Sequence, residues 1–367
     1  GREGGGGGAR GRVTAAAADD HATGYRVGPS EVAAFVERPE RPSVSFSPMR
    51  DKVLYIHRPP SSPPIAELAR KDVKLAGIRI DPELNTRAQM SKILKLEVDV
   101  LSAEAVPAGE PQAFSGLPEH AWLNFLSWAP DGRHIAFTVR DGAAEEEGRR
   151  VPPELWVAEV ETRKARPLLS GRPLNAVFDS YSWIDADRIV ACVIPQGRGA
   201  APERPSVPFG PSVQETTAGE LASNVTYQHL LKDEHDSEMF EYYAQSQLLT
   251  VQVETGEVNE WGLQEEDLGP RIYTDVTPSP DGRFVLATHL ERPFSYNVPC
   301  GRFPKRIELR SSADGSLVTE LCAHPLLENL PRVRNAVRPG KRSFDWRPDK
   351  PSQITFVEAQ DGGDPRV

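Results

Sequence analysis

Alternating apolar and polar residues recur along this chain on either side of a short turn rich in Pro, Asp and Gly. Two copies read LSWAPDGRHIAF at 126–137 and VTPSPDGRFVL at 276–286. Proline presets φ, and Asp and Gly accept the bend, so each copy predicts two antiparallel strands joined by a tight turn. Related copies lie at 44–55, 181–190 and 344–356. The pattern therefore predicts five β-hairpins.

Three of these hairpins are followed by a second pair of alternating segments, at 155–168, 248–261 and 307–322. Two strands plus two strands make a four-stranded antiparallel unit, and repetition of such a unit is typical of a β-propeller. Equivalent positions of the repeat are 55 to 95 residues apart, whereas a blade takes about 40–50 residues, so insertions are expected. The positions are Phe46, Trp128, Trp183, Pro278 and Trp346. A β-sandwich with several hairpins is the competing fold.

The segments between the strands predict loops and short helices. Residues 195–225 are rich in Pro, Gly and Ser and predict a long mobile loop. Apolar residues at helical spacing predict an amphipathic helix over Thr226–Tyr243, and Ser30–Val36 predicts a short helix before the first strand. We expect the three tryptophans of the repeat to fill space between neighbouring sheets.

Composition narrows the class further. The 34 prolines among 367 residues argue against a helical bundle. With 43 basic and 53 acidic residues the net charge is −10, which disfavours general binding to nucleic acid or to an anionic membrane. No apolar run reaches the roughly 18 residues of a membrane-spanning helix. Three cysteines cannot form a disulfide framework, so we expect free thiols in a reducing compartment: Cys192, Cys300 and Cys322.

Motifs of catalysis are absent from the sequence. It contains no G-x-S-x-G, no H-E-x-x-H and no P-loop, and the glycines at 4–8 are a low-complexity run. His229 and Asp233 lie four residues apart, with His235 and Asp236 nearby. They could form a metal site on one helix face, but without a third ligand at fixed spacing a solvated charged face is favoured. We predict no cofactor and no metal.

Several long segments carry a specific resemblance. They are 291–305 (ERPFSYNVPCGRFPK), 74–80 (KLAGIRI), 85–87 (NTR), 230–234 (LLKDE) and 360–364 (QDGGD). In this order they resemble the plant chloroplast glutamyl endopeptidases, which are prolyl-oligopeptidase-type serine peptidases. The resemblance covers residues 24 to the C-terminus, with a poor fit over 91–110.

This resemblance implies an all-β fold: a partial β-propeller of four-stranded antiparallel blades over residues 24–367, incomplete at the C-terminus, with short helical insertions. Residues 1–23 are expected to be a disordered leader or transit-peptide remnant, and the chloroplast stroma is the expected location. In the family the propeller caps a C-terminal α/β-hydrolase domain that holds the catalytic Ser, Asp and His. That domain is not expected in this chain, so no catalytic residue is assigned and the chain alone is predicted to be inactive.

The implied function is that of an access domain, or lid, of an endopeptidase that cleaves peptides after Glu through an acyl-enzyme. Its partners would be peptide substrates and the hydrolase domain of the same polypeptide. A cationic pocket would bind the Glu side chain, and the candidates are Arg292, Arg302 and Lys305. Alternatively, Arg292 and Arg302 bridge blades or cap strand ends. The alternative function is a stand-alone propeller that serves as a protein-interaction platform without catalysis.

Overall fold

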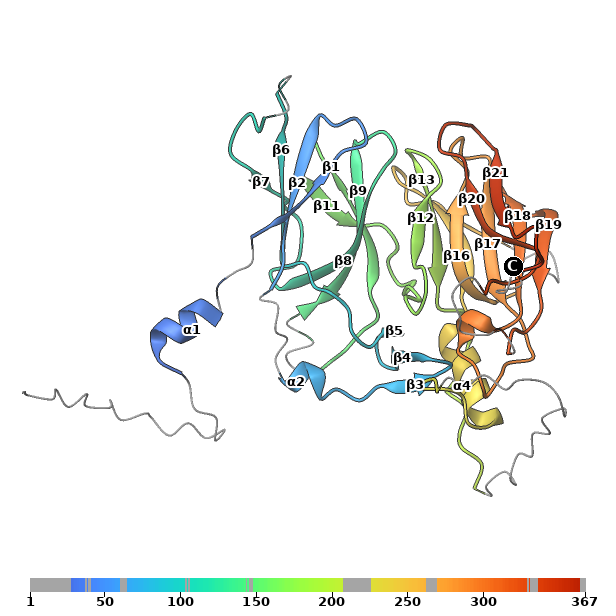
Figure 1. Ribbon diagram of the computed structural model, residues 1–367. Coiled ribbons are helices and arrows are strands. Elements are labelled where there is room, and N and C mark those ends of the chain that lie inside the picture. The colour runs from blue at the N-terminus through green and yellow to red at the C-terminus, as the bar shows by residue number, and fades with distance from the viewer. Residues whose placement is uncertain are drawn as a thin grey trace, which may run out of the picture.

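The computed structural model describes most of the chain between residues 28 and 363, except 37, 39–40, 60–64, 103, 105, 143, 145–147, 207–225, 262–268, 329 and 331–335. Strands dominate this part, and they form four sheets of four strands each (Figure 1). The first sheet contains β1 (Ser43–Phe46), β2 (Lys52–His57), β6 (Lys95–Val100) and β7 (Gln112–Ala113). The second contains β8 (Ala121–Trp128), β9 (His134–Asp141), β10 (Glu154–Glu159) and β11 (Lys164–Pro167).

The third and fourth sheets repeat the same up-and-down order. The third contains β12 (Tyr181–Trp183), β13 (Arg188–Val193), β14 (Gln247–Gln252) and β15 (Val258–Glu260). The fourth contains β16 (Ile272–Pro278), β17 (Phe284–Leu290), β18 (Lys305–Ser311) and β19 (Leu317–His324), and it is followed by the pair β20 (Lys341–Trp346) and β21 (Ile354–Glu358). All pairings in these sheets are antiparallel, so the five predicted hairpins and the three further strand pairs are confirmed.

Each sheet packs face to face against the next one along the chain. Leu54 and Leu96 of the first sheet share a core with Phe137 of the second. Further apolar cores join the second sheet to the third, the third to the fourth, and the fourth to β20–β21. A sandwich would bury a single pair of sheets, whereas here every inner sheet is covered by two successive neighbours. The chain therefore has the blade arrangement of a β-propeller, and the sandwich alternative is wrong.

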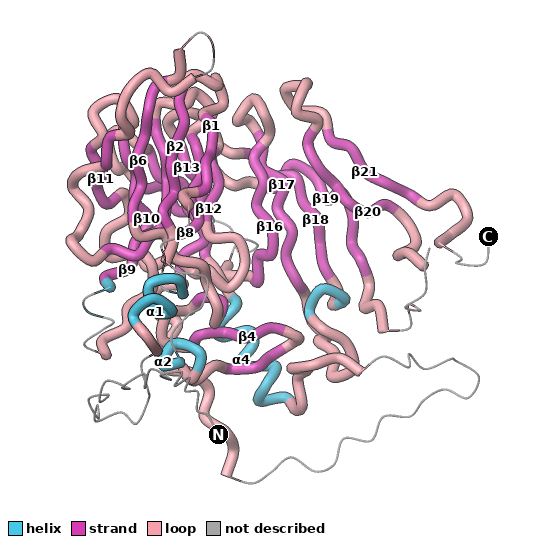
Figure 2. The backbone as a smooth tube through the Cα atoms, turned by 60° about the vertical axis from the view of Figure 1, so that its left-hand side comes forward, coloured by secondary structure: helices cyan, strands magenta, loops and turns pink. Residues whose placement is uncertain are grey.

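The long insertions all leave from one end of the sheets. They connect the second strand of a sheet to its third, and in an up-and-down sheet these connections lie at the same end. The first sheet carries α2 (Ile65–Leu68), β3 (Val73–Leu75), β4 (Ile78–Asp81) and β5 (Thr86–Arg87). The third carries α4 (Glu234–Ala244), and the fourth carries the 3₁₀ turn η2 (Cys300–Arg302). Figures 1 and 2 show α2, β4 and α4 gathered at this end.

The insertions pack on one another and form a layer of their own, which we call the insertion layer (residues 65–87, 227–244 and 291–304). Its core joins Ile80 of β4, Phe240 of α4 and Phe303 beside η2, all of them fully buried. The ring of Phe240 meets those of Phe294 and Phe303 edge to face, with centroids 5.5 and 6.0 Å apart. The layer thus links the first, third and fourth sheets directly.

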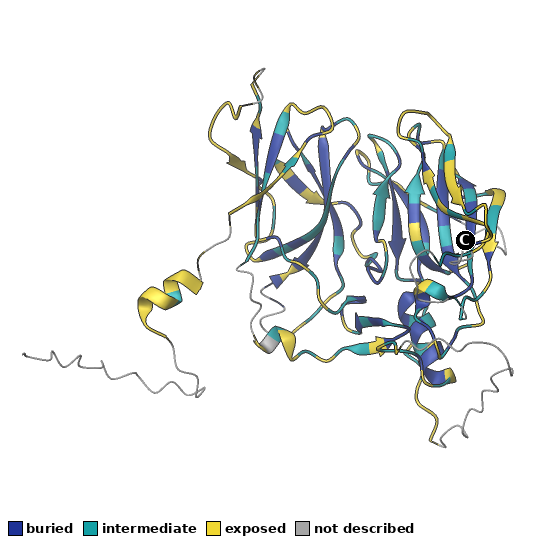
Figure 3. Cartoon of the chain, viewed as in Figure 1, coloured by how far each residue is buried: buried dark blue, intermediate teal, exposed yellow. Residues whose placement is uncertain are grey.

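Two helix predictions have different outcomes. The helix expected over Ser30–Val36 is present as α1, and its residues are largely exposed (Figure 3). The helix expected over Thr226–Tyr243 begins only at Glu234, because the Asp233 side chain accepts a hydrogen bond from the Asp236 amide and caps the helix there. The preceding His229 has a left-handed backbone, with φ 61°, which excludes it from a helix.

Other expectations concern loops, termini and cysteines. Residues 195–206 contain neither helix nor strand, and the rest of the predicted loop, 207–225, lies outside the described residues, as does the predicted leader 1–23. Although 91–110 matches the family pattern poorly, its strand β6 pairs in register with β2.

All three cysteines are free, Cys192 and Cys300 buried and Cys322 half-buried. Within the described residues, no helix has the length and apolar character needed to cross a bilayer.

Candidate functional site

The three predicted site residues lie on the fourth-sheet insertion, residues 291–304, and on the strand that follows it. This insertion docks onto the turn between β3 and β4, where the Cys300 amide donates to the Ala76 carbonyl at 2.8 Å. On its other side, the Arg302 carbonyl accepts from the Leu327 amide at 3.0 Å. Both ends of η2 are therefore fixed by backbone hydrogen bonds to segments distant in sequence.

Arg292 is committed to the helix α4. Its guanidinium donates to the Glu241 carboxylate at 2.8 and 3.1 Å and to the Glu234 carboxylate at 2.8 Å, and it lies over the ring of Phe294. Partial burial opposes its charge, but the hydrogen bonds and charges of Glu241 and Glu234 outweigh burial and raise the pKa of Arg292. This side chain joins the fourth-sheet insertion to α4.

Arg302 and Lys305 differ from Arg292 because no described carboxylate forms an ion pair with either. Arg302 donates to the Leu330 carbonyl at 3.0 Å and lies over the ring of Tyr227. Lys305 begins β18 and is half-buried, and its ammonium forms no hydrogen bond within the described part of the chain. Burial, and then the charge of Arg338, lower the pKa of Lys305, while Asp275 acts in the opposite direction.

Arg338 completes this group and was not predicted from the sequence. Its side chain donates to the Pro325 carbonyl at 3.1 Å. Burial lowers its pKa, and the charge of Arg302 lowers it further. Because Arg338 interacts electrostatically with both Arg302 and Lys305, we call these three residues the cationic cluster. No motif singles out Arg338 in the sequence, since it lies 33 residues after Lys305 in a segment without regular structure.

A buried histidine adjoins the cluster without adding charge. His324 ends β19, and its ring lies 3.7 Å from the Cys322 sulfur. Burial, with the charges of Arg338 and Lys305, lowers the pKa of His324 to about 4, so its ring is neutral at neutral pH. Arg338 is repelled by both Arg302 and Lys305, and no carboxylate within the described residues forms an ion pair with any of the three. An added carboxylate would relieve this repulsion, and the arginine side chain suits its planar geometry.

Three of the four residues of the metal-site alternative have other roles, and the fourth, His235, is buried in α4. His229 accepts a hydrogen bond from the Gly77 amide through its carbonyl, and Asp233 caps α4. Asp236 accepts from the Lys232 amide at 3.1 Å. Across the described ranges, no group of three or more His, Cys, Asp and Glu side chains is arranged to hold a metal ion.

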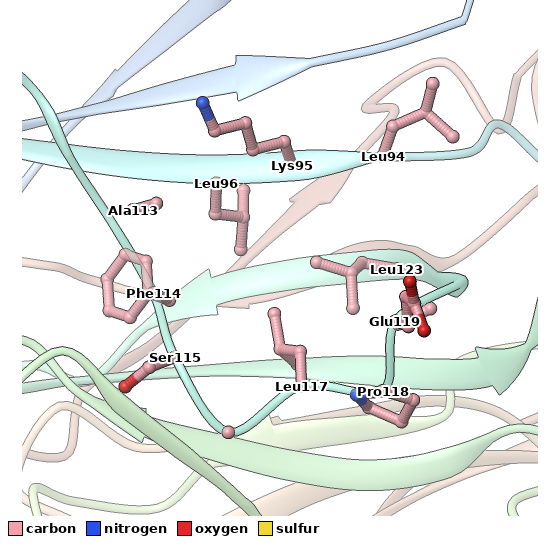
Figure 4. A pocket seen from close by; sticks show the side chains of 12 residues that line it. Leu94, Lys95, Leu96, Ala113, Phe114, Ser115, Leu117, Pro118, Glu119 and Leu123 are labelled. Carbon is pink, nitrogen blue, oxygen red and sulfur yellow. The ribbon is translucent and has the colours of Figure 1, made fainter.

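A separate hollow lies between β6 and the segment that leads into β8. It has a volume of about 280 Å³ and is lined mainly by apolar side chains, among them Leu96, Phe114 and Leu117 (Figure 4). Its lining residues come from the edges of the first and second sheets and from the segment 114–119 that joins them, whereas the cationic cluster belongs to the fourth sheet and the segments beside it. The two features are independent.

Sequence comparison relates the chain to named proteins. It is 43% identical over 346 residues to a protein of rice (Oryza sativa subsp. japonica) named "probable glutamyl endopeptidase, chloroplastic". A protein of Arabidopsis thaliana with the same name is 42% identical over 375 residues. This chain is a relative of the chloroplastic glutamyl endopeptidases. The resemblance stated from the sequence segments is thus confirmed.

The match covers 94% and 100% of this chain but only 36% and 38% of these glutamyl endopeptidases, so the chain spans little more than a third of their length. No family model matches the chain. Among solved structures, an acylaminoacyl peptidase of Pyrococcus horikoshii has 13% identity and a TM-score of 0.40, covering 89% of this chain and 39% of its own. The β-propeller domain of Cps50 from Myceliophteria thermophila has 9% identity and a TM-score of 0.34, covering 88% of this chain and 95% of its own.

Proposed function

We propose that this chain is the access domain of a serine-type endopeptidase of the chloroplast stroma that cleaves peptides after glutamate. The sequence similarity to proteins named glutamyl endopeptidases supports the activity, and the chloroplastic label of both relatives supports the compartment. In the intact enzyme a separate hydrolase domain would supply the nucleophilic serine, its histidine base and the acyl-enzyme. The sheets of this chain would restrict access to short or unfolded peptides.

The observation that carries this proposal is the cationic cluster. Of the three residues predicted to bind the glutamate side chain, Arg302 and Lys305 belong to the cluster, and Arg338 replaces Arg292 as the third cation. A bound carboxylate would relieve the repulsion that Arg338 experiences from the other two cations. It would also accept hydrogen bonds from guanidinium and ammonium groups that form no ion pair with a described acidic residue. This chain would thereby position the peptide, while the bond-breaking chemistry takes place on the hydrolase domain.

The test uses the protein expressed from the complete open reading frame that contains this chain. We expect cleavage of a peptide at Glu to exceed cleavage of the matched Gln peptide. Lys305→Met should lower kcat/KM for the Glu peptide about 10-fold, because one charge-assisted hydrogen bond to the substrate carboxylate is lost. The Gln peptide should be affected far less, because it offers no charge.

Two control variants distinguish this site from general charge effects. Lys164→Met removes an exposed lysine of β11 and should leave both peptides unaffected. Arg292→Gln should change stability more than Glu preference, because that arginine is bound to α4. Equal cleavage of Glu and Gln peptides by wild-type protein would contradict Glu recognition. Complete absence of peptidase activity would favour the interaction-platform alternative.

A further inference from the structure

The hollow between β6 and the segment 114–119 opens because the fourth strand of the first sheet is short. β7 has two residues, whereas β19, the fourth strand of the fourth sheet, has eight. The chain then crosses to the second sheet, where the Ser115 amide donates to the Arg163 carbonyl at 2.8 Å. On the side away from β2, no described strand pairs with Leu94 or Lys95. The edge of β6 is therefore uncovered beside the hollow.

Backbone hydrogen bonds fix both ends of the hollow. At one end, Ile93 and Leu123 exchange two backbone hydrogen bonds, at 2.8 and 2.9 Å. At the other end, the Phe114 amide donates to the Leu96 carbonyl at 3.3 Å. Because main-chain bonds hold the surrounding segments in place, the hollow is a preformed feature of the fold and not a gap between mobile side chains.

The lining of the hollow is mainly apolar, and its size suits a single side chain. Leu96 and Leu117 point towards each other across the space, and Phe114 lies beside them (Figure 4). The volume of about 280 Å³ is at the lower limit of small-molecule pockets, which span roughly 300–1,000 Å³. The hollow therefore fits one bulky apolar side chain better than a cofactor.

Two charged side chains line the rim of the hollow, and only one of them is paired. Lys95 forms an ion pair with Glu97, with 2.6 Å between the ammonium nitrogen and the carboxylate oxygen. Glu119 is exposed and forms no hydrogen bond or ion pair with any described residue. The hollow thus combines an apolar lining with one unpaired negative charge. This charge complements a cation that stands next to the bound apolar side chain.

We propose that this hollow binds an extended peptide segment in which a bulky apolar side chain stands next to a lysine or an arginine. The apolar side chain enters the space between Leu96 and Leu117, and the cation pairs with Glu119. The peptide main chain lies along the uncovered edge of β6 at Leu94 and Lys95, as in recognition by strand addition. The site contains no residue of the cationic cluster, so it is separate from the glutamate recognition proposed above.

The test uses the whole chain and the peptide probe acetyl-Ala-photoleucine-Lys-Ala-amide, whose photoleucine cross-links to its surroundings on irradiation. The probe contains no glutamate, so its binding does not depend on the cationic cluster. A matched probe has norleucine in place of lysine and lacks the charge. Mass spectrometry identifies the labelled residues, and the dependence of labelling on probe concentration gives the half-saturating concentration.

We expect the lysine probe to label residues 94–96 and 113–123 in preference to the rest of the chain. Glu119→Gln should raise the half-saturating concentration of the lysine probe about threefold, which is typical of one exposed ion pair. It should leave that of the norleucine probe unchanged. Glu257→Gln, which removes an exposed acidic residue between β14 and β15, should behave as the wild type with both probes.

Leu94→Ser tests the apolar contribution without changing the charge. Leu94 is 49% exposed, and the loss of its side chain should weaken the binding of both probes about fivefold. Leu317→Ser, at a leucine of β19 that is also 49% exposed, should weaken neither. Labelling spread evenly over the chain, or unchanged binding of the lysine probe by Glu119→Gln, would overturn the proposal. Equal effects of Leu94→Ser and Leu317→Ser would overturn it as well.

Discussion

Gly77, in the turn between β3 and β4, lies directly against the ring of Pro299, so that a β-carbon on Gly77 would overlap the β-carbon of Pro299. The backbone of Gly77 is also left-handed, with φ 84°. This contact is where the first-sheet insertion meets the fourth-sheet insertion. Only a residue without a side chain permits both the backbone conformation and the close approach.

Gly77→Ala is therefore expected to lower the free energy of unfolding by about 2–4 kcal/mol, the sum of left-handed strain and overpacking. Chemical denaturation would measure it. Gly256→Ala is the matched control: its φ is 71° but no atom lies within 4 Å of the added carbon. It should cost only about 1 kcal/mol, from strain alone. Equal losses in the two variants would show that the insertion contact contributes nothing.

Ser127 of β8 contacts two aromatic side chains of β12, across the boundary between the second and third sheets. Its hydroxyl accepts from the Trp183 indole at 3.1 Å and donates to the Tyr181 hydroxyl at 3.1 Å. Ser127→Ala leaves the indole donor without its partner, and the free energy of unfolding should fall by about 1–3 kcal/mol. The midpoint of urea denaturation reports this loss.

Ser182→Ala removes the hydroxyl at the equivalent position of the third sheet, which has no hydrogen-bond partner among the described residues. A change within about 0.5 kcal/mol is expected there. If Ser182→Ala were as destabilising as Ser127→Ala, the hydrogen bond from the Trp183 indole would not be the cause of the loss in Ser127→Ala.

Glu308 lies in a buried charge network of the fourth sheet. Its carboxylate accepts from Arg310 at 2.6 and 2.9 Å, and Arg310 is only 1% exposed. Burial alone would raise its pKa, but the hydrogen bond from His289 and the charge of Arg310 outweigh burial and lower the pKa of Glu308 to about 2. A lowered pKa in the folded state stabilises the fold above the unfolded value of 4.5, and this stability is lost as pH falls towards 2.

The wild type should thus lose about 3 kcal/mol from this group between pH 4.5 and 2, following the linkage of pKa to stability. Glu308→Gln should cost about 3–5 kcal/mol at pH 7 and should lack that part of the pH dependence. Unfolding free energies measured across this pH range give both values. Glu257→Gln, at an exposed turn residue, should retain the wild-type slope. A slope in Glu308→Gln as steep as in the wild type would refute the assignment.

Lys305 should be unfavourable for folding. It is half-buried, it is repelled by Arg338, and no described carboxylate forms an ion pair with it. Lys305→Met keeps the aliphatic stem and removes the charge, so we expect the free energy of unfolding at pH 7 to rise by about 1 kcal/mol, allowing for solvent screening. Lys164→Met should change it by less than about 0.5 kcal/mol. Thermal melts of the two variants decide the point, and a destabilised Lys305→Met would indicate a structural role.

The sheets were predictable from the sequence because their signals are local. The turn at 130–133 lies between segments with a two-residue period, and both are properties of a dozen adjacent residues. Strand β7 escaped prediction because it is only two residues long, and β3–β5 are likewise short. Strand β6 alternates polar and apolar residues over six positions and could have been predicted. The start of α4 was placed too early because Leu230 and Leu231 continue the helical spacing towards the N-terminus. The helix itself begins only after Asp233, which caps it.

The candidate site was predictable only in part. Arg302 and Lys305 stood out because they belong to a distinctive segment, but the sequence cannot show which charges are already paired. Arg292 looks the same in sequence, and only the packing of α4 brings Glu234 and Glu241 onto it. Arg338 is brought to the cluster by the path of the chain after β19, which no local pattern encodes.

A row of sheets that touch only their neighbours behaves as a one-dimensional array, in which a local fault is felt one step away. The insertion layer changes that behaviour, because the Asn85 side-chain amide donates to the Tyr243 carbonyl at 3.0 Å and the Cys300 backbone amide donates to the Ala76 carbonyl, across the ends of several sheets. These hydrogen bonds connect sheets that do not otherwise touch each other in the described part of the chain. We therefore expect a disruption at one end of the row to be felt beyond the intervening sheet, and the sheets to unfold together instead of one after another.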